Sequence, residues 1–308
     1  MRNTLPVLAS ILLLASWADC LGQGQPTKRP SQQFEIADCS VPFQANVTGA
    51  TYTVTQDLYF GGSGDCIDVT ASGITINLNG HMLSAYPCNC TGISISKGSS
   101  GVHILGGSIS GRGPNYGIHD MGDAALIENV TVGIAGTDGI FLDAVRGSVV
   151  NGVNVNGVAG HQSAGIQLLD TDHCLVEHSI ANHNGLANCE GKPCGGGVAS
   201  GISVGNSGSQ NLSKNNFIVG NQANYNVTTG IAVGGTGNVV ASNTANSNNT
   251  PGQPPGGWGI YVGGNNNLVI GNTASGNQTD DLYDPNADCG NDHWVSNMFT
   301  TRNEGCIH

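Results

Sequence analysis

The chain has 308 residues, of which 48 are glycine, 10% are charged and 5% are aromatic. This composition is typical of a protein with many tight corners and small packed side chains, in which few segments could form a helix. With Lys+Arg 9 against Asp+Glu 21, the formal charge is -12. Such a charge repels polyanions, so it excludes nucleic acid as a partner and would require metal ions to bridge an acidic polysaccharide.

The first residues have the pattern of an export signal. Arg2 precedes an apolar run from Leu5 to Trp17, and Ser16-Trp17-Ala18 offers a cleavage site with small outer residues. This run is too short to span a bilayer comfortably, and no other apolar run approaches that length. We therefore expect a signal peptide over residues 1–18, a linker over 19–34, no membrane span, and a secreted, periplasmic or cell-surface protein.

A Gly-Ile dipeptide recurs along the chain, each time at the start of a short alternating segment. Its copies are Gly92-Ile93, Gly117-Ile118, Gly139-Ile140, Gly165-Ile166, Gly201-Ile202, Gly230-Ile231 and Gly259-Ile260. The interval between successive isoleucines runs from 22 residues (118 to 140) to 36 residues (166 to 202). Such a period predicts one solenoid coil per copy, with the excess of the long repeats placed in loops at one corner.

A second motif follows each Gly-Ile segment in the C-terminal half, with asparagines at fixed spacing around one aliphatic residue and one alanine. Its asparagines are Asn216, Asn221 and Asn226, then Asn238, Asn243 and Asn248, then Asn267, Asn272 and Asn277. Asparagine tolerates a left-handed backbone at a corner, and its amide can bond to the asparagine stacked one coil away. We therefore expect ladders of like residues around a narrow core of Ile, Val and Ala.

These repeats resemble those of the right-handed parallel β-helix proteins of the pectate-lyase-like superfamily, over about residues 35 to 308. The segment from Ile74 to Leu83 is similar to an early coil of that family, and the segment from Asp284 to Cys306 is similar to a disulfide-closed cap of its bacterial members. The resemblance implies an all-β fold, a single-stranded right-handed parallel β-helix (solenoid) of about eight to ten coils, in one domain over 35–308 with a cap at about 280–308. We expect a monomer.

The same fold hosts lyases, hydrolases, epimerases and adhesins, so the resemblance does not fix an activity. It implies a secreted protein that binds an extracellular polysaccharide and cleaves it as a lyase or glycoside hydrolase. The alternative is a non-catalytic surface, structural or adhesion protein.

Ten cysteines fit an oxidising compartment. Local spacing favours three disulfides, namely Cys39 with Cys66, Cys189 with Cys194, and Cys289 with Cys306. Cys88 and Cys90 are ambiguous and could form one local bridge. Zinc is the alternative at Cys189 and Cys194, disfavoured by the Gly-rich surroundings and the export signal. Cys174 stands where later coils have a ladder asparagine, which predicts a buried thiol.

One candidate site comes from aligning the second motif over the middle coils. Glu128, Asn151 and Glu177 then occupy one outward lane, meaning a column of outward side chains at the same position in successive coils. His178 lies beside the last of them. Two carboxylates two coils apart would lie roughly 9.5 Å from each other, a separation suited to inverting glycoside hydrolysis. Glu128, Glu177 and His178 are therefore candidate catalytic residues and Asn151 is a candidate substrate ligand. The alternative is a solvated face.

A second candidate site lies after the Gly-Ile segments, where the outward lanes hold His119, Asp143 and Gln167. Asp143 is a candidate catalytic residue, and His119, Gln167 and the nearby Arg146 are candidate substrate ligands. Arg146 could face Asp143, or Asp170 and Asp172, across adjacent coils. Calcium-assisted elimination would need such carboxylates as ligands, so Asp170 and Asp172 are the candidate calcium site and no other cofactor is expected. The alternative is a surface ion pair.

Other patterns carry less weight. Thr137-Asp138-Gly139-Ile140 resembles part of a polygalacturonase signature, but its paired acid is missing, which favours a corner role for Asp138. The histidines of the middle coils are scattered around the coil, which disfavours a zinc or copper centre.

Overall fold

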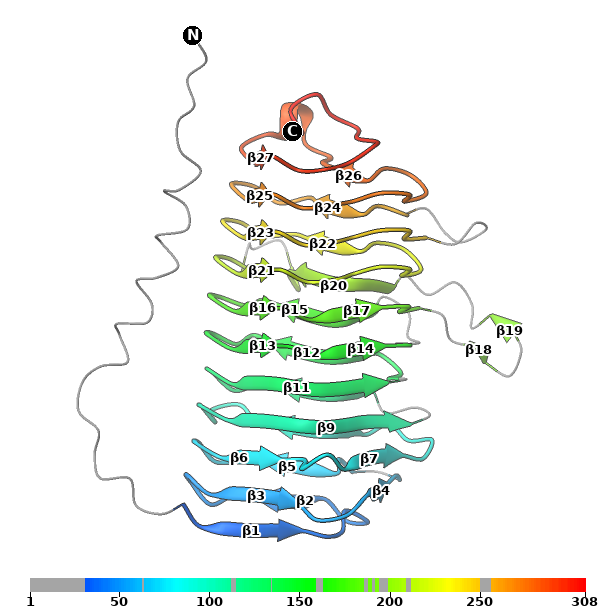
Figure 1. The fold of residues 1–308 in the computed structure, drawn as a ribbon. Helices are drawn as coiled ribbons and strands as arrows, with labels where there is room; N and C mark the ends of the chain where they lie inside the picture. The colour runs from blue at the N-terminus through cyan, green and yellow to red at the C-terminus, as the bar shows by residue number, and fades with distance from the viewer. Residues whose placement is uncertain are drawn as a thin grey trace, which may run out of the picture. The chain divides into compact units, whose positions relative to one another are not determined.

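The structure is a computed structural model (Figure 1) that describes residues 31–62, 64–111, 115–133, 135–158, 163–185, 188–189, 192–193, 199–208, 212–249 and 256–308. The predicted signal peptide, most of the predicted linker and Cys194 lie outside these residues. Residues Gln33–His308 form one compact unit. In the described part of the chain, no helix is long and apolar enough to cross a membrane.

The compact unit is an all-β, right-handed parallel β-helix, as the repeat predicts. Its two large sheets are parallel throughout, and the strands of successive coils stack on one another in both of them (Figure 1). The ten-stranded sheet, called sheet B below, contains β2 (Phe43–Ala45), β5 (Ile67–Val69), β8 (Thr91–Ile95), β10 (Tyr116–Asp120), β12 (Asp138–Asp143), β15 (Ser163–Leu169), β20 (Ala199–Gly205), β22 (Ile231–Val233), β24 (Ile260–Val262) and β26 (Leu282–Tyr283).

The fifteen-stranded sheet, called sheet A, covers the other two faces because two long strands continue across the corner between them. Its first face contains β1 (Gln33–Ile36), β3 (Thr51–Val54), β6 (Thr75–Asn77), β9 (His103–Gly111), β11 (Leu126–Gly133), β13 (Val149–Asn151), β16 (Leu175–Glu177), β21 (Phe217–Val219), β23 (Val239–Ala241), β25 (Leu268–Ile270) and β27 (His293–Val295). Its second face contains β4 (Leu58–Phe60), β7 (Met82–Ala85), β14 (Asn154–Asn156) and β17 (Ile180–Asn182), together with the second halves of β9 and β11. A small antiparallel pair, β18 (Asn188–Cys189) and β19 (Lys192–Pro193), stands apart.

The Gly-Ile repeat has a steric cause. The isoleucines stack in register from coil to coil and are fully buried, as Ile118 and Ile140 illustrate. A Cβ atom on Gly117 would lie 2.4 Å from Cγ1 of Val132 and 2.6 Å from the carbonyl oxygen of Gly139. Because neither neighbour can retreat cheaply from a packed core, only glycine fits where sheet B meets the second face of sheet A.

The asparagine ladders are present and buried. The Oδ1 of Asn238 accepts hydrogen bonds from the backbone N–H (2.9 Å) and the Nδ2 (3.1 Å) of Asn216, and its own Nδ2 donates to Oδ1 of Asn267 (3.1 Å). Cys174 is the buried free thiol at the start of this ladder, and its N–H donates to Oδ1 of Asn216 (2.9 Å). One expectation is wrong: the left-handed residue of each corner is the one before the ladder asparagine, such as Asn215 (φ 55), and not the asparagine itself.

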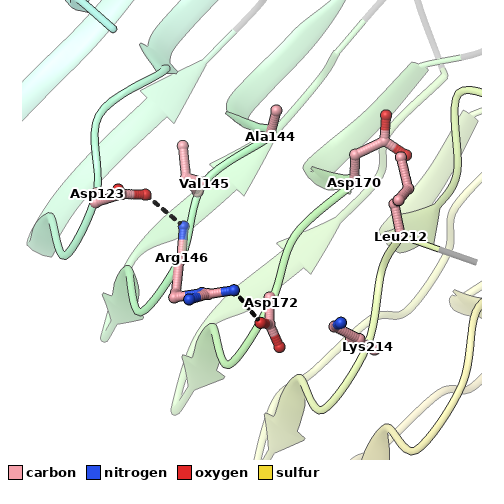
Figure 2. Close-up of a pocket in the computed structure, with 8 residues that line it drawn as sticks. All are labelled: Asp123, Ala144, Val145, Arg146, Asp170, Asp172, Leu212 and Lys214. Atoms are coloured by element: carbon pink, nitrogen blue, oxygen red, sulfur yellow. Dashed lines mark hydrogen bonds and ion pairs between the residues drawn. The ribbon is translucent and has the colours of Figure 1, made fainter. Parts of the chain in front are cut away.

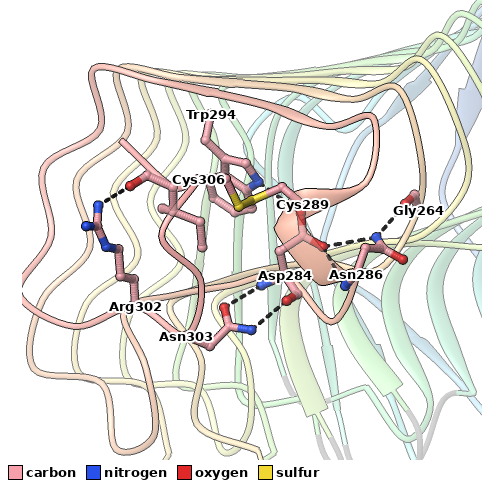
Figure 3. Close-up of a disulfide and its surroundings, with 9 residues drawn as sticks. Gly264, Asp284, Asn286, Cys289, Trp294, Arg302, Asn303 and Cys306 are labelled. Atoms are coloured by element: carbon pink, nitrogen blue, oxygen red, sulfur yellow. Dashed lines mark hydrogen bonds between the residues drawn. A yellow bond between two sulfur atoms is a disulfide. The ribbon is translucent and has the colours of Figure 1, made fainter.

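The last coil is closed by a disulfide between Cys289 and Cys306 (Figure 3). The buried Trp294 donates from its Nε1 to Oδ2 of Asp284 at 3.0 Å, which ties β27 to the short 3-10 helix η3 (Ala287–Cys289) and its approach. Asn286 donates its backbone N–H to Oδ1 of the same carboxylate at 2.9 Å. The resulting cap covers the final core layer.

Two further disulfides lie near the other end of the solenoid. Cys39 is bonded to Cys66, and Cys88 is bonded to Cys90. The pairing of Cys189 with Cys194 falls outside the described residues.

Candidate functional site

The predicted site residues fall into three places on the solenoid. His119, Asp143 and Gln167 lie on sheet B, in β10, β12 and β15. Glu128, Asn151 and Glu177 lie on the first face of sheet A, with His178 directly after β16. Arg146, Asp170 and Asp172 lie at the corner where the chain passes from sheet B to sheet A. The four predicted catalytic residues are therefore not together, because Asp143 is on a different face from Glu128, Glu177 and His178.

The lane of carboxylates on sheet A has the expected register. Glu128 pairs with Asn151, which pairs in turn with Glu177 on the next coil. Each carboxylate also has a histidine neighbour: Nε2 of His103 lies 2.7 Å from Oε1 of Glu128, and Nδ1 of the exposed His178 lies 3.7 Å from Oε2 of Glu177. His103 was not among the predicted residues, although it occupies the outward position two residues before Leu105, the in-register neighbour of Glu128.

Sheet B carries three stacked rings on its middle coils. The ring centroid of His119 lies 4.9 Å from that of Phe141 and 4.8 Å from that of Tyr116, and Tyr116 lies 5.2 Å from Phe141. Strand register produces the stack, because His119 pairs with Phe141 and Tyr116 pairs with Asp138 on the next coil. The name sheet-B cluster is used below for Tyr116, His119, Phe141, Asp138 and Asp143.

Burial is the main cause of the shifted pKa values in this cluster. Burial lowers the pKa of His119, and the nearby Asp143, whose Oδ2 lies 3.4 Å from Nε2, opposes the shift only in part. The His119 imidazole is therefore neutral at pH 7, as a general base must be. Burial also raises the pKa of Tyr116, and the charges of Asp138 and Asp143 add to that shift.

Asp138 is the second titrating group of the cluster. Its side chain is buried, and its Oδ1 accepts the backbone N–H of Ala164 at 2.7 Å. Burial raises its pKa to about 7, against the opposing effect of that hydrogen bond. Sequence reasoning gave Asp138 only a corner role and passed over Tyr116. The sequence did contain the relevant pattern, because Tyr116 and Asp138 each stand two residues before the isoleucine of their coil and therefore occupy the same lane.

A pocket of about 430 Å³ opens at the corner beside this cluster (Figure 2). It is lined by Asp123, Ala144, Val145, Arg146, Asp170, Asp172, Leu212 and Lys214. Ala144 directly follows Asp143, so the pocket begins where β12 ends. Nη2 of Arg146 lies 2.9 Å from Oδ2 of Asp172. The pocket thus presents two cations and three carboxylates beside the acid–base groups of sheet B.

The two candidate calcium ligands already have partners. Asp172 pairs with Arg146 and with His173, and Asp170 accepts the backbone N–H of Ser207 at 2.9 Å. Among the residues that the structure describes, no three His, Cys, Asp or Glu side chains are grouped so that they could hold a metal ion.

Comparison with known proteins identifies the fold and no closer relationship. No protein-family model matches the chain, and no curated protein sequence matches it. Among solved structures, the A-module of the Azotobacter vinelandii mannuronan C-5 epimerase AlgE4 is similar over 96% of this chain and 92% of its own, with a TM-score of 0.59 and 15% identity. An alginate lyase from Paenibacillus is similar over 90% of this chain and 99% of its own, with a TM-score of 0.50 and 13% identity.

The Dettilon tailspike protein is similar over 89% of this chain, with a TM-score of 0.52 and 14% identity, but this chain spans only 60% of its length. The chain is therefore a right-handed parallel β-helix protein like these three. At such identities the likeness concerns the fold alone.

Proposed function

We propose that this protein is exported, binds an extracellular polysaccharide along sheet B, and cleaves it by proton transfer at the sheet-B cluster. The observation that carries the proposal is the neutral His119 beside Asp143 and Tyr116 on one face, next to the cations of the corner pocket. The similar structures include a mannuronan C-5 epimerase and an alginate lyase, which supports a polysaccharide ligand.

The chemistry that fits these groups is elimination from a uronic acid residue. The neutral His119 imidazole would take the proton from the carbon that bears the sugar carboxyl group, with Asp143 stabilising the imidazolium that forms. The electron pair of that C–H bond becomes the new C=C bond, and the glycosidic C–O bond breaks. The Tyr116 hydroxyl would give its proton to the departing oxygen. No water is consumed, and the products are an unsaturated uronide and a shortened chain.

The two cations of the corner pocket are where a substrate carboxylate would bind. Arg146, which follows β12, and Lys214, which precedes β21, are the two cations of the pocket, in a chain whose net charge is -12. The three carboxylates of the same pocket oppose their attraction for a polyanion, and that attraction acts only within about a Debye length, so binding would be weak and would weaken further as salt rises.

A second candidate is inverting hydrolysis by Glu128 and Glu177, which the register of their lane favours. It would require one carboxyl to protonate the leaving oxygen and the other to activate water. The 2.7 Å contact between Glu128 and His103 favours the sheet-B proposal, because the carboxylate that would have to act is already engaged with the His103 ring.

The experiment is a panel of alginate, pectate and neutral glucans, assayed for absorbance of unsaturated uronides and for new reducing ends. Elimination gives both signals, hydrolysis gives reducing ends alone, and a non-catalytic protein gives neither. We expect His119→Gln and Tyr116→Phe each to lower the rate by 10²-fold or more. The matched variants Glu128→Gln and Glu177→Gln should keep it. Loss of activity in the glutamate variants, with the sheet-B variants active, would establish hydrolysis instead.

Calcium, secretion and the monomeric state stay predictions. No step above is routed through calcium, and adding a chelator to the assay tests whether the ion is needed. Mass spectrometry of protein collected from the medium tests cleavage after residue 18. Light scattering tests the monomer.

A further inference from the structure

A second group of rings lies on sheet B near the C-terminal end of the solenoid. The ring centroid of Trp258 lies 5.1 Å from that of Tyr261 and 4.9 Å from that of Tyr283, and the two tyrosines stack at 5.6 Å with an interplanar angle of 10°. All three side chains are half-buried, so part of each is open to solvent.

This group repeats the positions of the sheet-B cluster. Trp258 stands two residues before its coil's isoleucine, as Tyr116 does, and Tyr261 stands directly after it, as His119 does. Tyr283 pairs with Tyr261 one coil on, as Phe141 pairs with His119. The same three lane positions therefore carry rings twice, the second time without a histidine.

Between the two ring groups, most outward side chains of sheet B are small. Strand pairing leads from Phe141 through Gln167, Ser203 and Ala232 to Tyr261, in four coil-to-coil steps. At about 4.8 Å a step, the two ring groups are separated by ~19 Å along the solenoid. The neighbouring outward lane holds Leu169 and then Gly205, Gly234 and Gly263, so the strip between the rings has small side chains from Ser203 and Gly205 onward.

Glycine also makes room for one of the rings. A Cβ atom on Gly263 would lie 2.7 Å from the hydroxyl oxygen of Tyr261, so the tyrosine lies across its own strand only because residue 263 has no side chain. A larger residue at position 263 would displace the ring from this place.

We propose that Trp258, Tyr261 and Tyr283 form a second sugar-binding subsite, which holds the same polysaccharide several sugar residues away from the sheet-B cluster. Rings with an apolar face and a polar edge suit sugars, which pair C–H faces with hydroxyl groups. The subsite lacks the His119 equivalent, so it binds without reacting. This inference rests on the proposed function, because it needs a chain that lies along sheet B.

The test compares oligosaccharides of two lengths on the full chain by calorimetry, with mannuronate and glucose oligomers as the acidic and neutral probes. A trimer reaches one ring group only, and an octamer is long enough to reach both. We expect the octamer of the bound class to bind at least tenfold more tightly than the trimer. Trp258→Ala should remove about tenfold of octamer affinity and leave trimer affinity unchanged.

Two further variants distinguish loss of the subsite from general damage to the fold. Gly263→Ala keeps every ring and displaces only Tyr261, and it should also weaken octamer binding alone. Tyr225→Ala removes an aromatic ring that is 52% exposed and stacks on His183, away from sheet B, and should change neither affinity. Equal octamer affinity in wild type, Trp258→Ala and Gly263→Ala overturns the subsite while trimer binding leaves the proposed function standing. Absence of binding of either class at either length overturns both.

Discussion

Replacing the buried Asp138 by asparagine should make the protein more stable in alkali, and the size of the effect follows from its surroundings. The side chain is 5% exposed, and burial raises its pKa from 3.8 to about 7. A shift of about three pH units corresponds to ~4 kcal/mol between the two protonation states. Because the folded pKa lies above the unfolded one, this contribution is fully present below pH 3.8 and is lost as the pH rises through 7.

Asparagine keeps the Oδ1 atom that accepts the Ala164 N–H and carries no charge to desolvate. Between pH 5 and pH 8 we therefore expect the free energy of unfolding of Asp138→Asn to gain about 3 kcal/mol relative to wild type. Equilibrium guanidinium unfolding of both proteins at both pH values measures it. The difference between variant and wild type cancels the titration of every other carboxyl. A difference that does not change with pH would refute the assignment of the titration to Asp138.

Three further predictions concern the frame of the solenoid. Asn238→Ala leaves buried N–H groups of its ladder without an acceptor and should cost about 3 kcal/mol by denaturant unfolding, whereas the half-buried Asn246→Ala should cost less than about 1 kcal/mol. Gly117→Ala should destabilise by at least about 1–3 kcal/mol, and Gly208→Ala, with nothing within 4 Å of its added Cβ, should not. Cys289→Ser opens a link between residues 17 apart and should lower the stability by about 3 kcal/mol relative to oxidised wild type, a difference that should disappear when both proteins are reduced.

Most of the fold was predictable because each coil repeats the same steric problem. The Gly-Ile copies set the strand register that the structure has, from Asp68 beside Ser94 to Ala232 beside Tyr261. The backbone conformation of the corners was not predictable from the asparagines alone. Any residue before the ladder position can take the left-handed form when the ladder bonds hold it there, and Ser242 and Tyr225 do.

The site was less predictable for a geometric reason. Lanes can be read within one face, and the lane of Glu128 and Glu177 was found in this way. Which faces adjoin depends on how sharply the chain bends at each corner, and that is not a property of residue spacing. Asp143 and the two glutamates were therefore all named as catalytic candidates, although they lie on different faces. The likeness of the ring groups at Tyr116 and Trp258 was missed because their lane contains mostly small or acidic residues elsewhere.

As the pH rises, the titrating groups of sheet B raise the activity and lower the stability. Proton abstraction needs the neutral form of His119, whose pKa lies below its usual 6.5, so the rate should rise with pH on the acidic side and level off. Stability falls in the other direction, as Asp120 and then Asp138 ionise with pKa values of about 6 and about 7. The wild type therefore gains rate and loses stability as the pH rises, and the loss of stability is complete once the pH has passed about 7. Because Asp138→Asn removes only the loss of stability that comes from Asp138, it should extend the time over which activity persists at pH 8, while the pH dependence of the rate stays where His119 puts it.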